Sequence, residues 1–164
     1  MLRNLFLVLC FTISPGVHAQ SDGAAFGRLT QTEVGQLFAF ARASRYDLES
    51  DLKLTYAKDE AALGRVFAFS MQFRTLDANA RTYGQFINNS FMLLVEELGL
   101  ETYAAVLTGQ PPEVQQRIRD FLFYPTTQVP KKQRLPAEKT LRQIYSAVFP
   151  PDYVFGQQDP IFQQ

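Results

Sequence analysis

Residues 83–98 read YGQFINNSFMLLVEEL, and the spacing of their apolar side chains decides the fold class. One set of positions recurs at alternating intervals of three and one, which is the pattern of one face of an α-helix; it comprises Tyr83, Phe86, Ile87, Ser90, Phe91, Leu94, Val95 and Leu98. Met92 and Leu93 lie off this face, so the helix is apolar all round near its middle. We therefore expect a central helix, ended by Gly99, with Phe91, Leu94 and Val95 buried and Met92 enclosed by neighbours.

Helix starts can be placed on both sides of this segment from capping residues. Thr30 and Glu33 form a capping box that predicts a first helix to about residue 44. Asp47 can cap a second helix, in which Leu48, Leu52 and Tyr56 share a face, and Asp59 can cap a third, to about residue 74. A short helix is expected over residues 101–108. Pro111-Pro112 opens the next helix, which Pro125 closes.

The last predicted helix begins at Pro136 and is stopped by Pro150-Pro151. Its expected inner face is Leu141, Ile144, Tyr145 and Val148. The sequence thus predicts an all-α single domain of about seven helices, either an irregular helical bundle or a short α-solenoid of helix pairs.

A possible internal repeat bears on that choice. Residues 34–41, VGQLFAFA, match residues 63–70, LGRVFAFS, in residue class, and residues 83–87 are a fainter echo. Each copy places a glycine in a helix, at Gly35, Gly64 and Gly84, which indicates close approach between helices. A recognisable third copy at the same spacing is missing, and solenoids need three or more units, so the bundle is favoured.

The first 19 residues have the segments of a secretory signal peptide in the usual order: Arg3, an apolar run from Leu5 to Ile13, the pair Pro15-Gly16 and a small residue at Ala19. The run is too short to span a membrane, which takes about 20 residues. We expect cleavage after Ala19, so that the mass of the exported protein begins at Gln20. The expected organisation is a signal peptide at 1–19, a flexible segment at 20–29, a helical domain at 30–149 and an extended aromatic tail at 150–164. Localisation is then periplasmic or secreted.

Charge and composition exclude several function classes. The chain has 16 Lys and Arg and 16 Asp and Glu, interspersed along the helices, so nucleic acid is not an expected partner. Its one Cys and one His, Cys10 and His18, both lie in the leader. The mature chain therefore lacks the residues for Ser-His-Asp or Cys-His catalysis and for the usual zinc sites. No cofactor, metal or catalytic residue is expected, and Asp47, Glu49 and Asp51 are interpreted as a solvated face.

The lack of Cys and His in the mature chain does not exclude catalysis by carboxylates, because a glycan-cleaving enzyme needs only acidic side chains. The candidates are Glu96, Glu97 and Glu101, for which a solvated surface is the favoured interpretation. A carboxylate-dependent enzyme acting on peptidoglycan stays the alternative hypothesis.

Two segments are candidate binding sites. Lys131, Lys132 and Arg134 are placed in a proline-punctuated basic loop over residues 125–136, where they can meet an acidic partner or anionic head groups. The tail carries Tyr153, Phe155 and Phe162, which are too apolar to be left in water. They pack either on the chain's own helices or on a partner, and we interpret residues 152–164 as a docking segment.

The function expected from these observations is a non-catalytic protein-interaction module outside the cytoplasm. Its partner is another exported or envelope protein, and no transmembrane segment is expected after leader cleavage. An envelope-complex accessory subunit, an inhibitor and an immunity protein all fit. The sequence leaves the oligomeric state open.

Overall fold

The computed structural model describes residues 29–73, 78–127 and 131–154, with only the backbone described for 78, 123–127 and 131–137. The described chain is all-helical and forms a single domain around one hydrophobic core. It comprises α2 (Gln31–Ala43), α3 (Leu48–Tyr56), α4 (Glu60–Phe69), the 3₁₀ turn η1 (Ser70–Gln72), α5 (Ala78–Leu98), α6 (Leu100–Thr108), α7 (Pro112–Thr127) and α8 (Lys131–Ile144). The predicted all-α class is confirmed.

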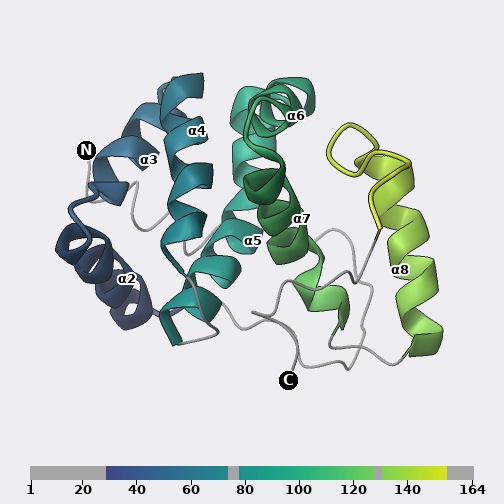
Figure 1. The fold of residues 1–164 in the computed structure, drawn as a ribbon, viewed down its shortest axis with the longest axis horizontal. Helices are drawn as coiled ribbons and strands as arrows, with labels where there is room; N and C mark the ends of the chain where they lie inside the picture. The colour runs from purple at the N-terminus through teal and green to yellow at the C-terminus, as the bar shows by residue number, and fades with distance from the viewer. Residues whose placement is uncertain (1–28, 74–77, 128–130, 155–164) are drawn as a thin grey trace.

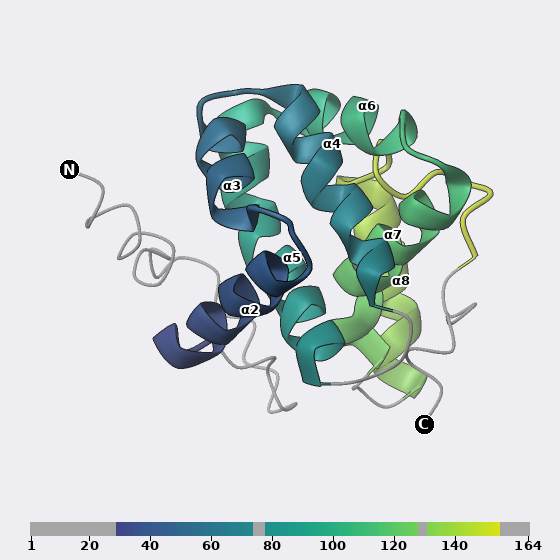
Figure 2. The ribbon, with the colours of Figure 1, turned by 60° about the vertical axis from the view of Figure 1, so that its left-hand side comes forward.

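Helix α5 is central, as its pattern predicts. It contacts α2, α3, α6 and α7, while α8 packs against α7 at one end of the long axis and α2 and α3 lie at the other (Figures 1 and 2). A solenoid unit contacts only its neighbours in sequence. Here α2 reaches α5, and α4 reaches both α6 and α7. With the helices paired as α2–α3, α4–α5 and α6–α7, however, these contacts all join adjacent pairs, so they fit both the bundle and the short solenoid of helix pairs.

The three predicted helix caps are confirmed. Thr30 Oγ1 accepts from the Glu33 amide at 3.2 Å, and the Glu33 carboxylate accepts from the Thr30 amide at 2.7 Å. The hydrogen bonds that this carboxylate accepts from the Thr30 amide and hydroxyl lower the pKa of Glu33. Asp47 and Asp59 accept from the amides of Ser50 and Ala62, each at 3.0 Å. These local contacts satisfy amides that a helix start leaves without a partner in the helix.

Two helix ends depend on left-handed residues that are not glycine. Arg45 has φ 59° and Lys58 has φ 67°. The Tyr46 amide donates to the Ala41 carbonyl, and the Asp59 amide to the Leu54 carbonyl, which is the long bond of a Schellman motif. Both turns are only a few residues long and lead directly to the next cap, Asp47 or Asp59.

The third predicted helix does not run to residue 74, because α4 tightens into η1 at Ser70. The Ser70 amide bonds to Phe67 O instead of Val66 O, and the Tyr83 hydroxyl from α5 donates to Val66 O. Arg117 from α7 donates to the carbonyls of Ser70 and Phe73. A cation at the C-terminal end of a helix is favourable, so these contacts both satisfy the carbonyls and join three helices.

The predicted basic loop over residues 125–136 is wrong. Pro125 lies in the last turns of α7, and α8 begins at Lys131 and contains Pro136. Proline lacks an N–H and crowds the preceding turn, which makes it a poor residue for a helix interior but does not forbid it near an end. The residues before Pro136, KKQRL, are mostly good helix formers, so the helix extends upstream of the proline.

Helix α8 also ends earlier than predicted. It stops at Ile144, which was assigned to the inner face but is 57% exposed. Tyr145 and Val148 lie in the turns that follow, where Val148 is nonetheless fully buried. In α5, Phe91 and Leu94 are buried as predicted, whereas Val95 is only partly buried and Met92 is 55% exposed. The prediction that neighbours enclose Met92 is wrong, because α8 packs mainly against α7 and leaves Met92 exposed.

The repeat glycines have three different surroundings. A Cβ on Gly84 would lie 2.7 Å from Cδ1 of Phe121, so α5 and α7 approach closely there. A Cβ on Gly64 would meet the Gln110 side chain at 3.0 Å, while Gly35 has nothing within 4 Å. Close approach is thus confirmed at Gly84, but at Gly35 it is wrong.

This contrast predicts opposite effects for one substitution. Gly84→Ala should lower the free energy of unfolding by about 1–3 kcal/mol, because the new methyl displaces the Phe121 ring. Gly35→Ala should raise it by about 0.5–1 kcal/mol, because the exposed helix loses a flexible residue. Urea denaturation of both variants checks this pair; equal effects of the two changes would contradict the packing at Gly84.

Candidate binding surface

Tyr153, a predicted binding residue, is part of the protein's own core. Its side chain is 5% exposed, and its hydroxyl donates to Asp120 Oδ1 at 2.8 Å. Its ring packs 5.5 Å from Phe149, and the Arg119 guanidinium lies 5.9 Å from the ring centre. The docking interpretation is therefore wrong for Tyr153, which takes the other alternative, packing on the chain's own helices. Phe155 and Phe162 lie outside the described residues.

Two arginines hold the segment that carries Tyr153. Arg119 Nε donates to Val148 O at 2.7 Å, and Arg142 donates to Pro150 O at 2.9 Å and to Tyr153 O at 2.5 Å. Burial lowers the pKa of Arg119, against the opposing influence of neighbouring Tyr153, Asp152 and Asp120. Hydrogen bonds from charged donors are stronger than neutral ones, so residues 145–153 are fixed although they form no helix.

Truncation tests this anchoring. Ending the chain after Pro151 removes Tyr153 and should cost about 2 kcal/mol of buried aromatic contact, which corresponds to a fall of roughly 5–10 °C in Tm. Ending it after Val154 keeps the anchor and is the matched control, expected to melt close to the full chain. Scanning calorimetry of both truncations separates the anchor from the residues beyond it. An unchanged Tm after the shorter truncation would contradict the anchoring.

Lys131, Lys132 and Arg134, the other predicted binding residues, lie in the first turns of α8. That end of a helix carries the positive pole of its dipole, so cations there gain nothing from the helix. Tyr153 O is bound by Arg142, near the opposite end of α8. The structure therefore does not bring these three residues together with Tyr153.

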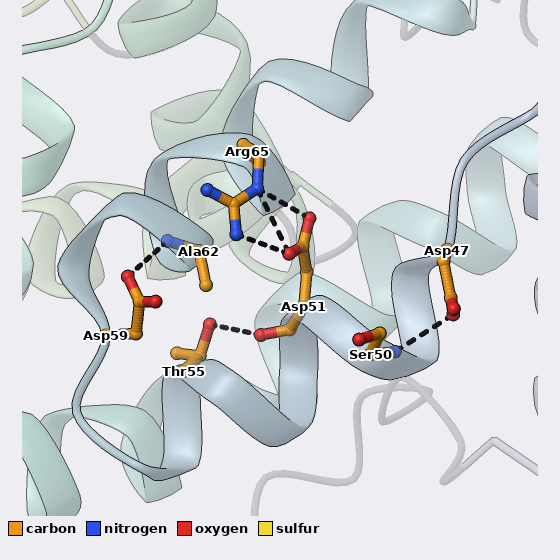
Figure 3. Close-up of polar contacts among 7 residues, drawn as sticks. All are labelled: Asp47, Ser50, Asp51, Thr55, Asp59, Ala62 and Arg65. Atoms are coloured by element: carbon orange, nitrogen blue, oxygen red, sulfur yellow. Dashed lines mark hydrogen bonds and ion pairs between the residues drawn. The ribbon is translucent and has the colours of Figure 1, made fainter.

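A pair that the sequence did not suggest joins α3 to α4. Arg65 donates to Asp51 through Nε at 3.0 and 3.1 Å and through Nη2 at 2.6 Å (Figure 3). The Asp51 side chain is 10% exposed and that of Arg65 is 49% exposed. Burial raises the pKa of the adjacent Tyr46, and the negative charge of Asp51 raises it further. Asp51 is therefore a structural contact between helices, and its assignment to a solvated face is wrong.

The carboxylates weighed for catalysis lie on the surface. Glu96, Glu97 and Glu101 are all exposed. The buried acids of the described chain are Asp51 and Asp120, and both accept hydrogen bonds, Asp120 from Tyr153 and from Gln116 at 2.9 Å. Within residues 29–73, 78–127 and 131–154, no three His, Cys, Asp or Glu side chains are grouped to hold a metal ion. None of these contacts favours glycan cleavage over a structural role.

Exposed apolar side chains gather where α5 meets the end of α8. Met92 on α5 and Ile144 on α8 are 55% and 57% exposed. Tyr145 connects them, since its hydroxyl donates to Met92 Sδ at 3.0 Å and its ring meets Phe91 edge to face at 5.1 Å. Leu141 precedes Ile144 by three residues and so shares its side of α8. We call Met92, Leu141, Ile144 and Tyr145 the α5–α8 surface.

No family model matches this chain, and comparison with curated proteins and with solved structures finds no similar protein. In the part of the chain that the structure describes, no helix is long and apolar enough to cross a membrane.

Proposed function

We propose that this protein is a non-catalytic interaction module that acts outside the cytoplasm and binds another exported or envelope protein through the α5–α8 surface. The observation that carries the proposal is the exposure of Met92 and Ile144 on either side of Tyr145. A large apolar side chain exposed to water gains free energy when a partner covers it. Ile144 precedes Tyr145 in the chain and Met92 accepts from the Tyr145 hydroxyl, so both exposed side chains belong to the neighbourhood of one tyrosine.

The composition of this surface supports a protein partner. Interface centres are enriched in aromatic residues and Met, and their rims are polar. The α5–α8 surface contains Tyr145 and Met92, and the exposed Glu96 lies one helical turn beyond Met92 on α5. In contrast, the buried polar side chains Asp51 and Asp120 are engaged in contacts within the fold.

The site of action rests on the leader-like residues 1–19, which support export. An accessory subunit, an inhibitor and an immunity protein all use a surface of this kind. The identity of the bound species separates them: an exported toxin or enzyme indicates an inhibitor or immunity protein, and a structural envelope protein indicates an accessory subunit.

Charge substitutions on this surface test the proposal. Ile144→Asp should leave Tm almost unchanged, because this side chain is exposed, whereas Met92→Asp also removes the contact with the Tyr145 hydroxyl and should lower Tm by a few degrees at most. Both variants should still fold and should remove the protein that co-purifies with the tagged chain from the envelope fraction. Leu54→Asp is the matched control, since Leu54 is 41% exposed on α3 at the other end of the molecule. Retention of the partner by all three variants, or its loss with Leu54→Asp, would contradict the assignment.

A further inference from the structure

Met92 differs from the other methionine of the described chain in its access to solvent. The Met92 side chain is 55% exposed, whereas Met71, in η1, is partly buried against the core. The Met92 sulfur also has a defined partner, the Tyr145 hydroxyl at 3.0 Å. A reagent in solution can therefore reach the Met92 thioether without unfolding of the protein.

We propose that Met92 is an oxidation site, converted by peroxides or hypochlorous acid to methionine sulfoxide. With hydrogen peroxide, one oxygen atom forms a bond to Sδ as the O–O bond breaks, and water leaves. The sulfur loses two electrons and the peroxide gains them. The product is polar and can be reduced back by methionine sulfoxide reductases, so the change is reversible.

Oxidation at this position alters a contact that joins two parts of the fold. The thioether of Met92 lies beside Tyr145, whose ring packs on Phe91. The Tyr145 carbonyl accepts from the amides of Val148 and Phe149, each at 2.9 Å, and so begins the turns that lead to Tyr153. An oxygen atom added to Sδ takes the position at which the Tyr145 hydroxyl bonds to the sulfur, and it displaces the Tyr145 side chain. The sulfoxide therefore loosens the start of residues 145–153 and makes the α5–α8 surface polar.

The oxidation site stands independently of the proposed function, whereas its effect on a partner rests on that function. If the α5–α8 surface binds a partner, the sulfoxide weakens the complex, because a polar group then occupies the apolar centre. Reduction of the sulfoxide restores binding. An exported protein would in this way lose its partner under oxidative attack and regain it afterwards.

Peptide mass mapping of the folded full chain treated with hydrogen peroxide tests the site. We expect Met92 sulfoxide to form several-fold faster than Met71 sulfoxide, and treatment to lower Tm by a few degrees. Met92→Leu should prevent that fall in Tm, and Met71→Leu, the matched control, should not. Equal oxidation rates at the two positions, or a Met92 that reacts only after unfolding, would overturn the proposal.

The same treatment separates this proposal from the proposed function. Co-purification of the partner should fall with peroxide-treated wild type but not with peroxide-treated Met92→Leu. If Met92 is oxidised selectively and partner binding is unchanged, the oxidation site stands and the binding surface is wrong. If Met92 is not oxidised selectively while Met92→Asp abolishes binding, the binding surface stands and the oxidation site is wrong.

Discussion

Leu94→Ala is expected to lower the free energy of unfolding by about 2–5 kcal/mol, the range for removing a well-packed leucine from a core. Leu94 is 2% exposed on α5, the helix that contacts α2, α3, α4, α6 and α7. Leu54→Ala is the matched control, because it makes the same change at a position that is 41% exposed, and should cost about 1 kcal/mol or less. Urea denaturation measures both. A loss below about 0.5 kcal/mol at Leu94 would show that α5 is not the centre of the core.

Strong alkali is expected to unfold the protein between about pH 11 and 13, because buried tyrosines must stay protonated in the fold. Burial raises the pKa of Tyr83, Tyr103 and Tyr153, and raises that of Tyr56 to about 12. In the unfolded chain these hydroxyls ionise near pH 10. Stability is therefore complete below about pH 10 and is lost as the pH rises above it.

The size of this effect follows from the two completely buried side chains. Tyr83 and Tyr103 are each 0% exposed. Each lowers the free energy of unfolding by about 1.4 kcal/mol for every pH unit over which it is protonated in the folded protein and ionised in the unfolded chain. Together they remove about 2.7 kcal/mol per pH unit, against a typical total of about 5–15 kcal/mol. Tyrosinate absorbance and far-ultraviolet circular dichroism should change together. Ionisation of all seven tyrosines near pH 10, with the helical signal intact, would contradict the burial.

The starts of α2, α3 and α4 could be predicted because each depends on residues three apart. Thr30 with Glu33, Asp47 with Ser50 and Asp59 with Ala62 are contacts within one turn, so the sequence contains all that determines them. The central helix could be predicted because a long apolar stripe has few alternatives. The C-terminal ends of α2 and α3 were harder to predict from the sequence. Arg45 and Lys58 take a left-handed conformation there, and glycine is the residue that usually indicates such an end.

The binding residues could not be predicted well, because they depend on contacts between distant parts of the chain. Asp51 pairs with Arg65 from the next helix, and Tyr153 bonds to Asp120, 33 residues away. Ile144 is expected on an inner face from its spacing, and Met92 is expected to be enclosed because α5 is apolar all round near its middle. Their exposure depends on where α8 lies and on its end at Ile144, which the position of the prolines did not reveal.

Site-specific photo-cross-linking in intact exporting cells tests the proposed interaction most directly. A photoreactive residue replaces Met92 or Ile144 on the α5–α8 surface, and Leu54 in the control. The proposal predicts one discrete cross-linked species, the same from positions 92 and 144, an exported or envelope protein, with no such species from position 54. Cross-linking from position 54 alone, or no cross-link from 92 and 144 in exported protein, would contradict it.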